Sequence, residues 1–429
     1  MSLFRDIDDI LNSAKVEFEE LKTQLESEKA ATPAGLFFDY DIEKYGSGNK
    51  LENTFFWGDN LEFMKLLFAG GLSGKVQLVY IDPPFFSKAK YEAYVGYKGH
   101  IVKNEAYTDS FSGGIAQYIK MLAIRLYFIY ELLADKGALW LHLDWHAAHY
   151  MKIVMDEIFG AENFVNEVVW AYKSGGSSKR SFAKKHDTLL FYSKTKEYYF
   201  DLPKEKSYNR GLSPYRFKNV KEYQDETGWY TLVNMKDVWN IDMLGRTSKE
   251  RTGYMTQKPE TLMMRIIESC SKSGDLCIDF FSGSGSFASA CQKLDRSWLA
   301  SDFGSVASSI MRKRCIDNLK DFSIVYKSNK KIRNILNISI ERFEKEYIIK
   351  LEGIPDSNKD IDIWGIYEKR AASDYHMKIV KKRSGAGQIE NRIAVEQADI
   401  EKNKKYAVLA VDIFGNIYEE RLYIGGDDI

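Results

Sequence analysis

The chain has few of the residues that build metal centres and covalent cross-links. Among its 429 residues there are four cysteines and six histidines. The cysteines are scattered, at Cys270, Cys277, Cys291 and Cys315. None of them forms a C-x-x-C pair, so the sequence indicates neither a zinc site nor a disulfide framework. The histidines at 142, 146 and 149 come closest to a ligand cluster, but no motif completes a site, and we expect no metal.

The sequence also lacks the marks of a membrane or exported protein. It contains no apolar run of about eighteen residues. Its N-terminus is charged from Arg5 onward and does not resemble a signal peptide. Together with the unpaired cysteines, this favours a cytoplasmic protein in a reducing compartment.

The charges of the chain give no globally basic surface. Lys and Arg total 61, Asp and Glu also total 61, and the net charge is zero. Contact with nucleic acid would therefore depend on local clusters of cations. The length predicts two or three domains, and 45% hydrophobic content supplies a substantial core.

The most informative segment is an apolar run, residues 76–81, that stops at Asp82, Pro83, Pro84 and Phe85. It is typical of a buried strand that delivers Asp82 to the carboxyl edge of an α/β sheet. Prolines lack backbone donors, so the carboxylate and the Pro83 carbonyl are left as acceptors for an amine, and Phe85 offers a stacking face. The alternative is a proline turn that only changes the direction of the chain.

A second pattern predicts a strand over residues 275–279, a glycine turn and a helix over 287–294. A further strand follows and ends at Asp302, a position that grips a ribose diol in nucleotide-binding βαβ units. The turn has Gly283 and Gly285 but no third glycine and no phosphate-binding lysine. The pattern therefore favours a nucleoside ligand without a pyrophosphate.

One stretch concentrates positive charge. Its cations occur without an intervening acid, beside the Ser-Gly segment 174–178, and they are Lys173, Lys179, Arg180, Lys184 and Lys185. A flexible loop flanked by cations is a candidate phosphate clamp for DNA. A solvated surface loop is the alternative.

Taken together, these motifs resemble the β-class DNA adenine N6-methyltransferases. The matching stretches are Phe56–Glu62, Asp82–Phe85, Leu141–Trp145, His186–Ser193, Thr256–Glu260 and Asp279–Gly285. Their order, with the amine-binding motif before the cofactor loop, marks the β class. Residues 411–416 are similar to the tail of modification subunits of type III restriction systems, although the chain is short for such a subunit.

The resemblance implies a role for each matched residue. Asp82 and Pro83 would bind the adenine N6, with Pro84 completing the motif and Phe85 stacking on the base where the family more often has Tyr. S-adenosylmethionine would be the cofactor, held by Asp59, Lys258, Asp279, Phe281, Gly283, Gly285 and Asp302. On sequence alone, a helix N-cap at Asp59 and a surface cation at Lys258 are equally good interpretations.

The fold implied is a Rossmann-like α/β methyltransferase domain with a DNA-recognition insertion and a small β-containing C-terminal domain. We expect an amphipathic helix at 1–35 and the catalytic half of the core at 36–165. A target-recognition region would follow at 166–250, the cofactor-binding half at 251–320 and an accessory domain at 321–429.

The function implied is site-specific methylation of adenine N6 in duplex DNA, with the base flipped out of the helix. A homodimer and a restriction subunit are compatible partners. The alternatives are a cytosine N4-methyltransferase, whose motif usually begins with Ser, and an RNA adenine methyltransferase. A noncatalytic nucleic-acid-binding subunit is a further alternative, and an NAD-linked oxidoreductase is a remoter one because the glycine pattern is incomplete.

Overall fold

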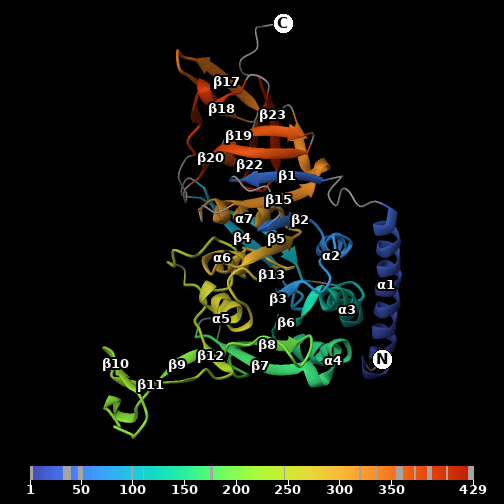
Figure 1. Cartoon of the computed structure of the whole chain (residues 1–429), viewed down its shortest axis with the longest axis vertical. Helices are drawn as coiled ribbons and strands as arrows, with labels where there is room; N and C mark the ends of the chain where they lie inside the picture. The colour runs from blue at the N-terminus through green and yellow to red at the C-terminus, as the bar shows by residue number, and fades with distance from the viewer. Residues whose placement is uncertain are drawn as a thin grey trace.

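One long twisted sheet runs through the whole molecule and carries helices on both faces (Figure 1). The computed structural model describes residues 3–31, 40–46, 52–97, 100–109, 111–173, 177–245, 247–317, 321–333, 336–353, 361–371, 373–383, 389–401 and 404–423. Among these residues, no helix has both the length and the apolarity that crossing a lipid bilayer requires.

The centre of this sheet is parallel. Its six neighbouring strands, in spatial order, are β6 (Leu133–Leu143), β3 (Val76–Ile81), β13 (Leu276–Asp279), β14 (Ser297–Asp302), β2 (Thr54–Trp57) and β15 (Phe322–Lys327). Each strand pairs in parallel with the next one in this order. A parallel sheet covered on both faces is the doubly wound arrangement, so the predicted Rossmann-like fold is confirmed.

Three strands extend the sheet beyond β6, namely β8 (His186–Ser193), β7 (Phe164–Ala171) and β12 (Val238–Asn240). β8 is antiparallel to β6 and to β7, whereas β12 runs parallel to β7. Beyond β15 the sheet continues through β1 (Tyr40–Tyr45), β20 (Asp374–Lys382), β19 (Ile361–Ala371), β22 (Lys405–Asp412), β23 (Ile417–Leu422) and β16 (Lys331–Arg333). A second sheet of β17 (Asn337–Arg342), β18 (Glu346–Gly353) and β21 (Arg392–Glu396) shares a hydrophobic core with β19 and β22. This is the β-containing C-terminal part that the sequence predicted.

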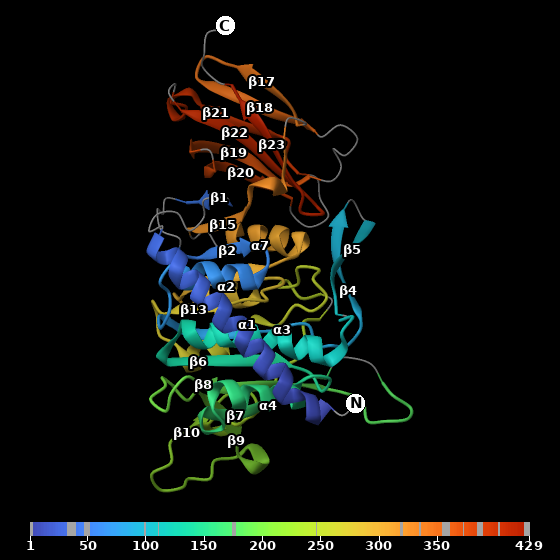
Figure 2. The ribbon, with the colours of Figure 1, turned by 90° about the vertical axis from the view of Figure 1, so that its right-hand side faces the viewer.

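The helices divide between the two faces of the parallel centre. One face is covered by α2 (Asn60–Ala69), α3 (Gly114–Leu132) and α4 (Ala148–Phe159), and the other by α5 (Glu260–Cys270), α6 (Ser286–Lys293) and α7 (Ser305–Asp317). The N-terminal helix α1 (Leu3–Ala31) crosses the outer side of α3 (Figure 2). Its Phe18 stacks on Tyr127 with ring centroids 5.2 Å apart.

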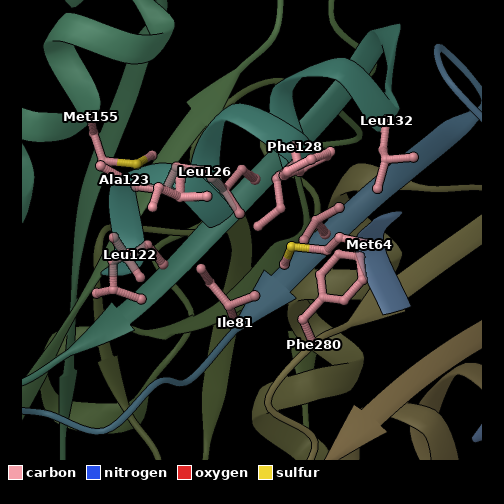
Figure 3. Packing of buried hydrophobic residues seen from close by; sticks show 14 of the residues in the cluster. Met64, Ile81, Leu122, Ala123, Leu126, Phe128, Leu132, Met155 and Phe280 are labelled. Carbon is pink, nitrogen blue, oxygen red and sulfur yellow. The ribbon is translucent and has the colours of Figure 1, made fainter. Parts of the chain in front are cut away.

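The core fixes the strand ends that carry the site. Figure 3 shows Ile81 and Phe280 packed together with side chains of α2 and α3. Both residues are fully buried, and each is the chain neighbour of a candidate site carboxylate, Asp82 or Asp279. Burying a side chain of this size stabilises the fold by about 1.5–3 kcal/mol. The two carboxylates therefore stand on anchored backbone.

The structure narrows two interpretations of the sequence. The sequence analysis grouped residues 166–250 as one recognition region. In the structure β7, β8 and β12 of that stretch pair into the main sheet, and side chains of all three strands are buried in its core. Outside the sheet lies a small antiparallel one of β9 (Lys204–Tyr208), β11 (Trp229–Asn234) and β10 (Glu222–Gln224), which projects from one end of the molecule in Figure 1. In the same way β15, at the start of the stretch 321–429, completes the parallel centre.

Candidate active site

A cavity opens at the carboxyl ends of β3, β13 and β14, the edge where open α/β sheets bind ligands. The space that protein atoms leave there is ≈ 1000 Å³, part of it open to solvent. The predicted residues that line it are Asp59, Asp82, Pro84, Lys258, Asp279, Phe281, Gly283 and Asp302. The structure thus brings together residues from five separate segments of the chain.

Asp82 follows β3 directly and has two different oxygens. Oδ2 forms an ion pair with the ammonium of Lys258, in the segment before α5. Oδ1 is buried and has no hydrogen-bond donor in the described part of the chain. Nδ1 of His142 lies 3.8 Å from Oδ1. One carboxylate oxygen is therefore left for a ligand.

The rest of the Asp-Pro-Pro-Phe motif surrounds this carboxylate. Pro83 is buried, and Pro84 is half-buried at the cavity wall. The ring of Phe85 lies against His142, with centroids 5.7 Å apart, and the Lys258 ammonium is 5.3 Å from its centre. Phe85 is not among the residues that line the cavity. Its stacking role stays a prediction.

The glycine turn is held by hydrogen bonds to a second candidate carboxylate, that of Asp302. The Gly283 N–H donates to Asp302 Oδ2 at 2.8 Å, and the Gly304 N–H donates to Oδ1 of the same residue, also at 2.8 Å. Gly285 has φ +75°, and a Cβ there would stand 2.3 Å from Met311 Sδ, so only glycine fits. The turn forms part of the cavity wall through Gly283, whereas Gly285 does not line the cavity.

Burial raises the pKa of two carboxylates at the cavity, those of Asp279 and Asp302. It raises the pKa of Asp279 well above the usual range, opposed by the Phe281 N–H and reinforced by the charges of Asp82 and Asp302. It also raises the pKa of Asp302, opposed by the donors at Gly304 and Gly283. Carboxylates converging on one cavity favour a ligand that is positively charged and rich in donors.

Asp59 serves two roles at once. Its Oδ1 caps α2 by accepting from the N–H groups of Leu61 and Glu62, at 2.9 and 3.1 Å. It also lines the cavity, where Arg125 of α3 lies 3.6 Å from its Oδ2. The N-cap interpretation is therefore confirmed, while its contact with a cofactor stays a prediction.

The cavity wall fits a nucleoside cofactor in one further respect. Ser282 Oγ is buried there and, within the described residues, has no hydrogen-bond partner, as is the case for Asp82 Oδ1. Buried polar groups are rarely left unpaired. Two such atoms at one cavity indicate that a ligand with polar hydrogens completes the site. Beside them, Phe303 is 78% exposed and offers an aromatic face at the rim.

Several residues of the site were missed by sequence reasoning. Asn60 donates to the Phe280 carbonyl at 3.1 Å and accepts from Arg125 at 2.6 Å, tying α2 and α3 to the end of β13. A lone arginine in the apolar helix 114–132 was the available signal for Arg125. His142 and Asp187 lie in the matched stretches Leu141–Trp145 and His186–Ser193, but their approach to 3.2 Å was not predicted because they come from different strands.

The basic stretch lies at the same edge of the sheet. Ala171 at the end of β7 pairs with His186 at the start of β8, and Thr188 pairs with Leu143 at the end of β6. The connection between β7 and β8 therefore emerges where Asp82 does. Its residues 174–176 lie outside the described part of the chain.

The cations of this connection are not all alike. Lys173, Lys179, Arg180 and Lys184 are exposed, whereas Lys185 is half-buried. The Lys184 ammonium stands 4.5 Å from the ring centre of Trp145, which follows β6. Between these cations Phe182 is 100% exposed. An apolar ring among cations suits contact with stacked bases next to phosphates.

Comparison with known proteins bears on the same residues. A family model described as DNA methylase, of the N6/N4 methyltransferase type, matches residues 76–313. The type II methyltransferase M.EcaI of Enterobacter cloacae is 29% identical over 325 residues, covering 62% of this chain and 69% of that protein. The probable type III HindVI Mod subunit of Haemophilus influenzae is 33% identical over 144 residues, covering 34% of this chain and 17% of the subunit. Among solved structures, the complex of M1.HpyAVI with SAM has 16% identity and a TM-score of 0.40, covering 61% of this chain and 98% of that one.

Proposed function

The chain belongs to the N6/N4 family of DNA methyltransferases, and from this we propose that it methylates the N6 amine of adenine at specific sites in duplex DNA. S-adenosylmethionine, present in the M1.HpyAVI complex, is the proposed methyl donor. It supplies an electrophilic methyl group on a sulfonium, a chemistry that needs no metal. The type II and type III relatives support a restriction-modification setting for this reaction.

The observation that carries the proposal is the free oxygen of Asp82. An exocyclic amine is a weak nucleophile because its lone pair is delocalised into the ring. Asp82 Oδ1 and the Pro83 carbonyl accept its two hydrogens, so that the nitrogen can pyramidalise and direct its lone pair at the methyl group. This is positioning and electrostatic stabilisation of the transition state.

The cofactor would occupy the cavity beside this oxygen. Asp302 accepts from the ribose hydroxyls, and the 281–285 turn with Asp279 surrounds the methionine part. Lys258 pairs with the methionine carboxylate, and Asp59 lies near the adenine. These assignments are supported by the cavity that these residues share, with the unpaired Ser282 hydroxyl at its wall.

A base inside a duplex is out of reach of Asp82, so the target adenine must be flipped into the site. We infer that the β7–β8 connection grips the flanking phosphates through its cations, with Phe182 against the bases. The small sheet β9–β11 stands apart from the core, and we assign to it the reading of the target sequence. A second copy of the chain or a restriction subunit is the further partner to test by size-exclusion chromatography coupled to light scattering.

The proposal is tested by mass spectrometry of DNA after incubation with the protein and labelled S-adenosylmethionine. We expect N6-methyladenine, and no product with the Asp82→Ala variant. N4-methylcytosine alone would reassign the target base, and preferential transfer to RNA would reassign the polymer. DNA binding without transfer would favour a noncatalytic subunit.

A further inference from the structure

A buried imidazole stands directly behind the amine-binding carboxylate. His142 lies on β6 and is 0% exposed. Its Nδ1 is 2.8 Å from the Tyr80 hydroxyl and 3.8 Å from Asp82 Oδ1. Its Nε2 is 3.2 Å from Asp187 Oδ2 on β8. The imidazole thus connects Asp82 to a second, deeper carboxylate.

The neighbours of the ring define its resting tautomer. Although burial opposes it, the hydrogen bond from His142 keeps the pKa of Asp187 below its usual value, so Asp187 is an ionised acceptor. Nε2 must therefore carry a hydrogen. Burial, reinforced by the charge of Asp82, raises the pKa of Tyr80 well above its usual range, so its hydroxyl stays protonated and donates to Nδ1. Nδ1 consequently carries no hydrogen, and its lone pair accepts from Tyr80 until rotation of that hydroxyl frees it for a proton from Asp82.

Methylation of an amine releases a proton that some group must take. As the nitrogen lone pair bonds to the methyl carbon, the carbon–sulfur bond breaks and its electron pair stays on sulfur. The nitrogen then carries a positive charge and one surplus hydrogen. The acceptor beside it is Asp82 Oδ1, which must lose that proton again before it can polarise another amine.

We propose that His142 takes this proton from Asp82 Oδ1 onto Nδ1, and that Asp187 stabilises the imidazolium that results. The proposal rests on the proposed amine methylation. No oxidant or further reactant is needed. Because the ring itself is buried, the proton reaches solvent through the partly exposed carboxylates beside it, Asp82 and Asp187, once the product has left. The 3.8 Å separation shortens when the amine engages Asp82, as catalytic hydrogen bonds commonly do on substrate binding. His142 acts through Asp82 and is a positioning residue, a proton relay.

The surroundings of the ring favour this role. From β3 it faces Tyr80 and Asp82, and from β8 it faces Asp187, which also accepts from the Tyr172 hydroxyl at 3.1 Å. The cation that acts on these carboxylates is Lys258. The remaining contacts are rings, of Phe85 at 5.7 Å and Trp170 at 5.5 Å. An imidazole placed between two carboxylates can accept a proton from one of them while the other stabilises the charge.

The decisive experiment is the pH profile of multiple-turnover methyl transfer to a duplex substrate by the 429-residue protein, because the relay resets Asp82 between turnovers. A relay must be unprotonated to act, so the rate rises with pH to a plateau. Asp187→Asn keeps the shape of the site but removes the charge that favours the imidazolium. We expect the midpoint of the rise to move to lower pH by about one unit, and the plateau to fall. Tyr172→Phe, which removes only a neutral donor from the same carboxylate, should leave the midpoint in place.

A second variant and a spectroscopic readout complete the test. His142→Gln should lower the plateau rate by about 10²- to 10⁴-fold, with cofactor affinity unchanged. The ¹⁵N shifts of His142, assigned by comparison with this variant, should show the Nε2–H tautomer in the free protein. An Asp187→Asn profile that matches wild type, or a folded His142→Gln variant with the wild-type rate, overturns the relay while the proposed function stands. Absence of transfer by wild type overturns both.

Discussion

The ammonium of Lys258 and the carboxylate of Asp82 form an ion pair across the cavity, although 176 residues separate them in the chain. Both side chains are largely buried, with 11% and 17% exposed. In the free protein, Lys258 therefore occupies Oδ2 of Asp82 as its ion-pair partner. The same cation is the proposed partner of the methionine carboxylate, so cofactor binding and release of Asp82 for the amine would be linked through Lys258.

Lys258→Met tests this link, because it removes the charge and keeps the length of the side chain. We expect affinity for S-adenosylhomocysteine to fall by about tenfold or more, the loss of one charge-assisted hydrogen bond. Affinity for 5′-methylthioadenosine, which has no carboxylate, should not fall. Calorimetry with both ligands measures the difference. Equal losses would place Lys258 elsewhere in the site.

Asp82→Asn keeps the volume of the side chain and replaces an acceptor oxygen with a donor. Because the role we propose for Asp82 is to act on the transition state, we expect kcat to fall by about 10²- to 10³-fold, while S-adenosylhomocysteine binding is retained. Phe85→Tyr is the matched control from the same motif and should remain active, since it restores the more usual family residue. A kcat for Asp82→Asn close to wild type would remove Asp82 from the chemistry.

Asp302→Asn should weaken cofactor binding, because it removes the carboxylate that organises the glycine turn and that we propose as the acceptor for the ribose hydroxyls. Asp275→Asn, at the opposite end of β13, is the control and should bind as wild type does. The effect of pH has a definite sign. Burial raises the pKa of Asp302 above its usual 3.8, so affinity should be constant at high pH and decline as the pH falls through a midpoint above 3.8. A decline centred below that value would contradict it.

A buried ion pair joins α7 to the sheet. Arg312 donates to both oxygens of Glu43 on β1, at 3.0 and 3.1 Å. Although burial opposes it, Arg312 holds the pKa of Glu43 below its usual 4.5. Its contribution to stability is therefore present above the unfolded pKa and is lost as the pH falls through the lower folded value.

Glu43→Gln should lower the free energy of unfolding by about 3–5 kcal/mol near neutral pH, because it leaves a buried cation unpaired. Urea unfolding at several pH values between about 3 and 7, a range that spans the usual pKa of a glutamate, measures the free energy of unfolding. It should show both the loss in the variant and a weaker dependence of its stability on pH. A variant as stable as wild type would show that the pair adds no net stability.

The sequence predicted those parts of the site that are local in the chain. The strands before Asp82 and Asp279, the turn at Gly283 and Gly285 and the strand ending at Asp302 all carry short-range signals, namely apolar runs that stop at breakers. Together with the family resemblance, these elements predicted the Rossmann-like fold. The main fold and most of the cavity could therefore be inferred.

What escaped prediction depends on contacts between distant segments. The pairing of Lys258 with Asp82 and of His142 with Asp187 follows from which strands become neighbours, and residue spacing does not encode it. One miss had a local signal. The hairpin of β4 (Lys90–Tyr97) and β5 (His100–Thr108) was not predicted, although Tyr91, Ala93 and Val95 recur at every second position of its first strand.

The β7–β8 connection is tested with a variant in which Lys179, Arg180 and Lys184 are all replaced by alanine. Removing one cation from a phosphate should reduce the slope of log K against log salt by about 0.9, so duplex affinity should fall most steeply at low salt. Lys75→Ala with Lys136→Ala is the control, since these exposed lysines lie near the first residues of β3 and β6, at the opposite edge of the sheet. Phe182→Ala should lower affinity without changing the slope, because it removes stacking but no charge. Fluorescence anisotropy over a salt series separates these outcomes, and an unchanged slope in the triple variant would place the DNA on another surface.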